Sequence, residues 1–313
     1  MFLENMLTAA QQVLILYIIV AVGFAAEKFG VYPEKVARSC TDLLFYVITP
    51  AKIIQSFITL DYNPETAKGL FIAIGCGLLL HGVAALISTA VFNKSGAEKG
   101  CIFKFACAYG NCGYMALPLA NAVLGEEGVF YCSAVIISFQ MFCFTHGIYA
   151  MNWGKQSGKS KVDIKRLVLN PGVISVIIGL PLFLLSVELP TALKTPVDYI
   201  ASLNTPLAML IFGTYIANTK FKTIFKEWRI LGVSFIKLLA LPMIMLGIFK
   251  LFGISGTLLT ALVMSASAPP ANNTVMFAAK YDRDTGLASQ TVTAASLISI
   301  VTMPLMIGLA SSL

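Results

Sequence analysis

The chain alternates between long apolar runs and short polar loops along its whole length. Ten of the runs reach about 20 residues, which is enough for an α-helix to cross the hydrocarbon core of a bilayer. The pattern therefore predicts an all-α polytopic membrane protein with ten transmembrane helices. The predicted helices lie near 7–27, 39–60, 68–92, 101–123, 128–151, 171–189, 196–217, 230–251, 256–279 and 287–310.

Composition supports this interpretation, because 58% of the 313 residues are hydrophobic and only 12% are charged. A soluble domain usually carries about 25% charged residues. The longest stretch outside the predicted helices is a basic linker at 152–170, so almost nothing remains for a soluble domain.

The basic residues fall mainly in alternate loops, which predicts the orientation of the chain. Loops after the odd-numbered helices hold 17 of the 22 Lys and Arg residues, whereas the opposite loops hold 3. Positively charged loops stay in the cytoplasm. We expect a multi-pass protein of the cell (inner or plasma) membrane with both termini extracytoplasmic. Nucleic acid is excluded as a partner, because the charge is spread over five short loops instead of one basic face.

The cysteines and the absence of common enzyme motifs give no indication of a metal site or of catalysis. The seven cysteines are odd in number and form no CxxC pair, so we interpret them as small packing residues, with no metal site and no cofactor. The chain also lacks the HExxH, GxSxG and Walker GxxxxGK[ST] patterns, so we expect no enzyme.

Two pairs of proline motifs recur at nearly the same spacing. Thr49-Pro50 and Thr205-Pro206 are 156 residues apart, and Pro118 precedes the Pro269-Pro270 pair by 151 and 152. This offset predicts two five-helix repeats, 1–151 and 171–313, joined by a cytoplasmic linker at 152–170. Because each repeat has an odd number of helices, the second would be inverted, as in many secondary transporters.

Helices 4 and 9 contain the least helical sequences of the apolar runs, "YGNCGYMALPLAN" (109–121) and "SASAPPANN" (265–273). Proline costs about 3 kcal/mol or more in a helix interior, and polar residues at that depth are expensive. We predict that both helices are discontinuous and cross, with Pro118, Pro269 and Pro270 in the crossover backbone. The N-terminal ends of half-helices suit an anion. The alternative is that each proline only kinks its helix.

The same stretches resemble the auxin efflux carrier family, in its bacterial branch of malate and malonate permeases. The matching segments are "NCGYMALP" (111–118), "TPLAMLIFGTYIA" (205–217), "APPANNTVMFAAKY" (268–281) and "VTAASLISIVTMPL" (292–305). The resemblance implies a scaffold domain, a transport domain that moves like an elevator, a homodimer, and an organic anion bound at the crossover. It also implies a site at Asn111, Pro118, Pro269, Pro270, Asn272 and Asn273.

Two further polar residues within predicted helices are candidates for substrate binding. Gln140 could hydrogen-bond a substrate or join two helices, and Lys52 could face a substrate carboxylate or extend to the outer interface. His81 and His146 could carry a proton or fill structural roles, and a coupling ion, H⁺ or Na⁺, is left unassigned.

The sequence therefore predicts a secondary transporter of a small organic anion. The expected cargo is a mono- or dicarboxylate such as malate or malonate. The alternative is a membrane sensor of a small organic acid that uses the same fold without transport.

Overall fold

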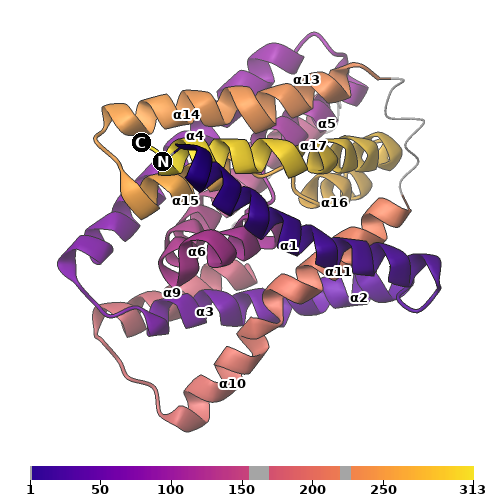
Figure 1. The fold of residues 1–313 in the computed structure, drawn as a ribbon. Helices are drawn as coiled ribbons and strands as arrows, with labels where there is room; N and C mark the ends of the chain where they lie inside the picture. Colours follow the sequence, from indigo (N-terminus) through magenta and orange to yellow (C-terminus); the bar gives the residue numbers. More distant parts are fainter. Residues whose placement is uncertain (1, 155–168, 219–226) are drawn as a thin grey trace.

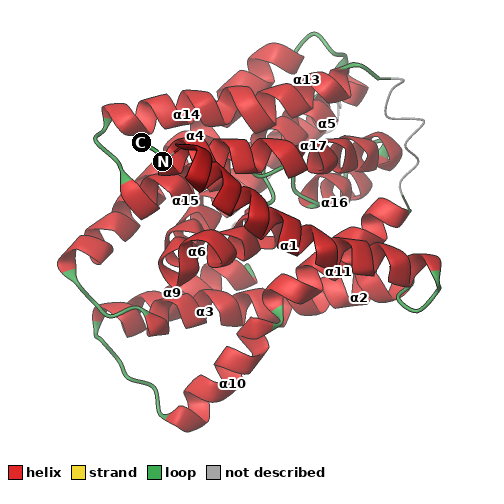
Figure 2. Cartoon of the chain, in the orientation of Figure 1, coloured by secondary structure: helices red, strands yellow, loops and turns green. Residues whose placement is uncertain are grey.

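The computed structural model describes residues 2–154, 169–218 and 227–313, and these residues form helices and loops without a β-strand (Figures 1 and 2). Most of the predicted linker at 152–170 lies outside the described residues. The first half of the chain contains α1 (Phe2–Lys28), α2 (Glu34–Leu43), η1 (Leu44–Ile48), α3 (Thr49–Thr59), α4 (Pro64–Phe92), α5 (Ala97–Ala108), η2 (Cys112–Ala116), α6 (Leu117–Phe142), η3 (Cys143–Gly147) and α7 (Ile148–Asn152).

The second half contains α9 (Pro171–Leu184), α10 (Thr191–Ser202), α11 (Asn204–Ala217), α13 (Arg229–Phe235), η4 (Ile236–Ala240), α14 (Leu241–Leu251), α15 (Gly256–Ser267), α16 (Asn273–Lys280) and α17 (Thr285–Ser311). Within α6, Gly125 has φ 68° and ψ −157°, so the helix is broken there although it is drawn as one element.

Six helical stretches among the described residues are long and apolar enough to cross a membrane. One of them, at 112–152, runs through the break at Gly125 and so covers parts of two predicted helices. Other predicted helices are shorter or interrupted, such as the 14-residue α9 and the 12-residue α15. The structure therefore shows a helical protein with several candidate membrane spans, and the count of ten stays a prediction.

Three widened helical turns, η1, η2 and η4, each end immediately before an X-Pro step. The N–H groups of Thr49, Leu117 and Leu241 donate to carbonyls five residues earlier instead of four. Pro50, Pro118 and Pro242 are then the second residues of the following α-helices. A proline ring clashes with the carbonyl four residues before it, and a widened turn relieves that contact. The helices consequently pass through these prolines without being interrupted.

Helices α1 and α11 lie side by side and approach closely at two glycines (Figure 1). A Cβ at Gly23 would overlap the backbone of Leu210, and one at Gly213 would overlap the backbone of Val20. Small residues permit such close helix packing inside a membrane.

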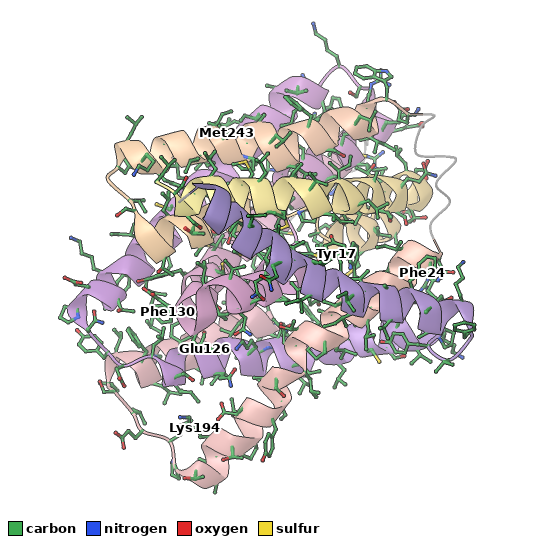
Figure 3. All side chains as sticks on the ribbon, viewed as in Figure 1. Tyr17, Phe24, Glu126, Phe130, Lys194 and Met243 are labelled. Atoms are coloured by element: carbon green, nitrogen blue, oxygen red, sulfur yellow. The ribbon has the colours of Figure 1, made fainter. Side chains whose placement is uncertain are left out.

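Apolar side chains fill the interior and also cover the outer faces (Figure 3). Phe130 is fully buried, whereas 48% of Met243 is exposed on the outward side of α14. An apolar outer surface is what a bilayer requires of a protein that spans it.

Candidate binding site at the crossing of two interrupted helices

Two helical stretches are interrupted, one in each half of the chain. Residues 109–111 separate α5 from η2, and residues 268–272 separate α15 from α16. The second interruption includes Pro269 and Pro270, which have no N–H group to continue a helix.

The interrupted segments meet and satisfy each other's backbone groups. The N–H of Asn111 donates to the carbonyl of Pro269 at 2.6 Å, and the N–H of Ala271 donates to the carbonyl of Tyr109 at 2.9 Å. In a low-dielectric interior, an unpaired N–H or carbonyl costs several kcal/mol. The two breaks therefore stabilise each other, because each supplies donors and acceptors that the other lacks.

Gly110 and Pro270 form a single antiparallel bridge at this crossing. A Cβ on Gly110 would lie 2.9 Å from Lys237 Nζ and 3.0 Å from the carbonyl oxygen of Ala268. Glycine at 110 is thus what allows the two backbones and the lysine side chain to approach so closely.

Lys237 lies behind the crossing, where the C-terminal ends of α5 and α15 come together. Its side chain is 1% exposed and its ammonium donates to the carbonyl of Ala266 at 3.1 Å. Among the described residues no carboxylate pairs with it. Helix C-terminal ends carry partial negative charge, so the ammonium compensates these carbonyls.

The N-terminal ends of the next helices, η2 and α16, carry three asparagines. Asn111 Oδ1 accepts a hydrogen bond from the N–H of Tyr114 at 3.2 Å, which caps the helix. Asn273 Nδ2 faces Cys143 Sγ at 4.0 Å, and Asn272 precedes it at the helix start. The nitrogen of the Asn111 amide remains available as a donor, beside two helix ends of partial positive charge.

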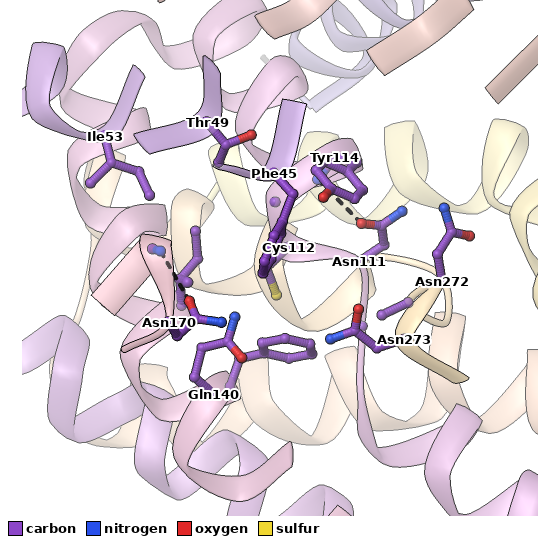
Figure 4. A pocket seen from close by; sticks show the side chains of 16 residues that line it. Phe45, Thr49, Ile53, Asn111, Cys112, Tyr114, Gln140, Asn170, Asn272 and Asn273 are labelled. Carbon is purple, nitrogen blue, oxygen red and sulfur yellow. Dashed lines mark hydrogen bonds between the residues drawn. The ribbon is translucent and has the colours of Figure 1, made fainter. Parts of the chain in front are cut away.

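A cavity of about 50 Å³ opens next to these asparagines (Figure 4). That space holds a few water-sized groups, which fits a small organic molecule. Its lining contains amides, a threonine, tyrosine and cysteine, and apolar groups, but no Lys, Arg, His, Asp or Glu among the described residues. The lining residues are Phe45, Thr49, Ile53, Gly110, Asn111, Cys112, Gly113, Tyr114, Ile136, Phe139, Gln140, Asn170, Gly172, Ala271, Asn272 and Asn273.

Two other amides lie on the opposite side of the cavity from the asparagines of the crossing (Figure 4). Gln140, on α6, is 5% exposed, and its Oε1 has no hydrogen-bond partner within the described part of the chain. Asn170 caps α9 by accepting a hydrogen bond from the N–H of Gly172 at 3.0 Å. The cavity thus has one end, at the crossing, where helix N-termini and asparagines favour an anion, and a second, neutral end formed by the amides of Gln140 and Asn170.

Comparison with known proteins decides the class of molecule to which this site belongs. The model of a family described as "Membrane transport protein" matches residues 8–307 of the chain. The chain belongs to this family, the auxin efflux carrier family. It is therefore a membrane transporter with several apolar helices and not an enzyme.

Relatives across bacteria and archaea cover nearly the whole transporter. An uncharacterized transporter of Methanocaldococcus jannaschii is 23% identical over 94% of this chain and 96% of its own. A protein of Rhizobium meliloti named "Putative malonate transporter" is 24% identical over 91% of this chain and 90% of its own. An uncharacterized transporter of Methanothermobacter thermautotrophicus is 25% identical, with 95% and 97% covered.

Lys52 is not among the residues that line the cavity, and it forms an ion pair elsewhere in the transporter. Its Nζ lies 2.7 Å from Glu126 Oε1 and 2.9 Å from Gln55 Oε1, and the side chain is 7% exposed. A carboxylate of this chain already neutralises its charge, and a role of Lys52 in substrate binding stays a prediction.

Pro118 requires correction, because the break lies at 109–111 and not at the proline. From Cys112 to Leu124 the backbone of the transporter is helical, and Pro118 is buried near the start of α6. The widened turn η2 accommodates the proline, so this residue does not open the helix. Pro269 and Pro270 do lie within their interruption.

Sequence analysis missed three polar residues that line the cavity of the transporter: Thr49, Tyr114 and Asn170. The Asn-Pro-Gly sequence at 170–172 is a recognisable helix start, and it could have marked Asn170 as a cap. No local signal shows that this cap faces the crossing, because the segments at 109–111 and 268–272 are remote from it in sequence.

Proposed function

We propose that the transporter carries a small organic anion, a mono- or dicarboxylate such as malate or malonate, with one carboxylate bound at the crossing. The observation that carries the proposal is the crossing itself. It directs two helix N-terminal ends and the amides of Asn111, Asn272 and Asn273 toward one cavity without charged side chains. The name of the Rhizobium meliloti relative, which includes malonate, supports the same class of cargo.

The proposal includes ten transmembrane helices arranged as inverted repeats, 1–151 and 171–313, joined by a cytoplasmic linker at 152–170. Both termini would be extracytoplasmic. One contact supports the repeat: Asn204, beside the Thr205-Pro206 motif, donates from Nδ2 to Thr49 Oγ1 of the other motif at 2.9 Å. Equivalent segments related by a two-fold axis in the membrane would meet in this way.

Transport by elevator-type alternating access, and a homodimer, belong to the same proposal. The cavity supports the elevator because its walls come from two groups of helices. One wall consists of η1, α3 and α9, and the other consists of the crossing and α6. If the second group slides against the first, the same cavity can open to either side of the membrane.

The test is saturable uptake of labelled malonate or malate by proteoliposomes that contain the purified protein. Asn111→Ala should weaken substrate binding by about 1–3 kcal/mol, because a carboxylate loses one donor. Asn111→Asp should bind still more weakly, because it opposes two negative charges. Asn218→Ala, an exposed asparagine that bonds Glu27 away from the cavity, is the matched control.

Two results would contradict this proposal in different ways. Wild-type affinity of Asn111→Asp would show that the anion binds away from the crossing. Specific binding by the wild type without any flux would show that the protein senses an organic acid and does not transport it.

A further inference from the structure

We propose that the cargo enters this site with a single negative charge and a second, uncharged end that both donates and accepts hydrogen bonds. The inference rests on the proposed function at the crossing and specifies its substrate. The groups that meet this description are a half-protonated dicarboxylate, a hydroxy acid, and the half-amide of a dicarboxylate.

The charges around the cavity suffice for one carboxylate only. Lys237 is the cation nearest the crossing in the described chain, and it lies behind Gly110. Lys52 is already neutralised by Glu126. A second ionised carboxylate would lose its water against neutral groups, and burying an unpaired charge is expensive.

Gln140 shows what the second end of the cargo must offer. Its Oε1 is buried and has no partner among the described residues. Such an oxygen accepts hydrogen bonds and needs an O–H or N–H donor. A carboxylic acid or a primary amide supplies that donor, whereas a carboxylate has none and would repel the oxygen.

Asn170 completes this neutral end. Its Oδ1 is occupied by the N–H of Gly172, which leaves Nδ2 as a donor. In Figure 4 the amides of Asn170 and Gln140 lie near each other on the same side of the cavity. The O–H of an uncharged carboxyl can donate to Gln140 while its carbonyl accepts from Asn170.

The consequence concerns the proton. A dicarboxylate that binds as its monoanion carries a proton on its own second carboxyl. Proton movement would then accompany the cargo without a protonated side chain in the cavity.

The test measures affinity for three probes by titration calorimetry on the purified wild-type protein across a pH series. Malonate changes from monoanion to dianion through its second ionisation. Malonamate is a monoanion throughout and retains a donor at its neutral end. Monomethyl malonate is also a monoanion, but its ester has no donor.

Malonate affinity should fall about tenfold per pH unit above its second ionisation, because only the monoanionic fraction binds. Malonamate affinity should stay constant over the same range, and monomethyl malonate should bind about tenfold more weakly than malonamate, since Gln140 stays unpaired. Equal or stronger malonate binding in the dianion range would overturn the inference while leaving the proposed function intact. If none of the three acids binds, the proposed function itself is wrong.

Malonamate also serves as the control for the protein's own titration. The titratable side chains on or beside the elements around the cavity include Tyr46, Lys52, His81, Tyr109, Cys112, Tyr114, Glu126, Glu127, Tyr131, Cys132, Cys143, His146, Lys237 and Lys280. Ionisation of any of them would change the affinity of malonamate and malonate together. Only a change in the cargo affects malonate alone.

A variant tests the role of Gln140 separately. Gln140→Met keeps the size of the side chain and removes its hydrogen-bonding groups. It should bind malonamate and monomethyl malonate equally, whereas an unchanged tenfold preference for malonamate would overturn the assignment of Gln140. The wild-type probe series does not depend on how this variant folds.

Discussion

Lys52 on α3 and Glu126 on α6 form an ion pair of 2.7 Å across 74 residues of sequence. Lys52 also donates to Gln55, whose amide donates to Asp198 on α10 at 2.7 Å. One chain of contacts therefore joins α6 to α3 and α10. In the proposed elevator α6 and α3 belong to the two groups that slide past each other, so the pair would have to open during transport.

Lys52→Glu combined with Glu126→Lys tests this pair. Each single exchange should lower stability and uptake, because it places two like charges in contact. The double exchange should recover part of both losses, with a coupling free energy of about 0.5–3 kcal/mol. The readouts are thermal unfolding in detergent and proteoliposome uptake. Losses that simply add would mean that the two residues do not interact.

Gly110→Ala should impair both folding and uptake. The new Cβ would meet Lys237 Nζ at 2.9 Å and the carbonyl oxygen of Ala268 at 3.0 Å, so the crossing must separate. Gly113→Ala is a matched control, because it lines the same cavity and its Cβ would have no neighbour within 4 Å. If both variants behave like wild type, the crossing tolerates a Cβ at position 110 and the contact is not restrictive.

Gly213→Ala should destabilise the protein by about 1–3 kcal/mol, the usual range for overpacking. Its Cβ would overlap the backbone of α1 at Val20. Gly247→Ala on α14 is the control, because nothing lies within 4 Å of its Cβ. Thermal unfolding in detergent measures both, and equal midpoints would argue against a close α1–α11 contact.

The predicted orientation can be tested with a membrane-impermeant maleimide on intact cells. Asp61→Cys, in the exposed loop between α3 and α4, should label from outside. Lys94→Cys, in the exposed loop between α4 and α5, should label only after the cells are permeabilised. The unsubstituted protein gives the background from its own cysteines. Labelling of Lys94→Cys from outside would reverse the orientation.

The sequence predicted the asparagines of the cavity because their signal is local. Prolines beside small and polar residues in an apolar run mark a backbone that cannot stay helical. Asn111, Asn272 and Asn273 lie beside those interruptions and line one cavity. Their binding of substrate stays a prediction.

The same reasoning failed where the deciding partner is remote. Glu126 follows Lys52 by 74 residues, so no local pattern shows that the lysine is neutralised. Pro118 misled for another reason, because a widened turn lets a helix accept proline without breaking. The sequence shows where a proline disturbs a helix, but not whether the fold responds with a break or with a widened turn.

The widened turns have an evolutionary consequence. Such a turn contains one residue more than the α-helix around it needs. Deleting that residue would rotate everything beyond it by about 100°. The turn η4 contains Lys237 and precedes Pro242. If a relative lost this proline, deleting the additional residue would still rotate the side chains on one side of the turn relative to those on the other. The additional residue should therefore be retained even in relatives that have lost the proline, so that their aligned sequences show no gap at this turn.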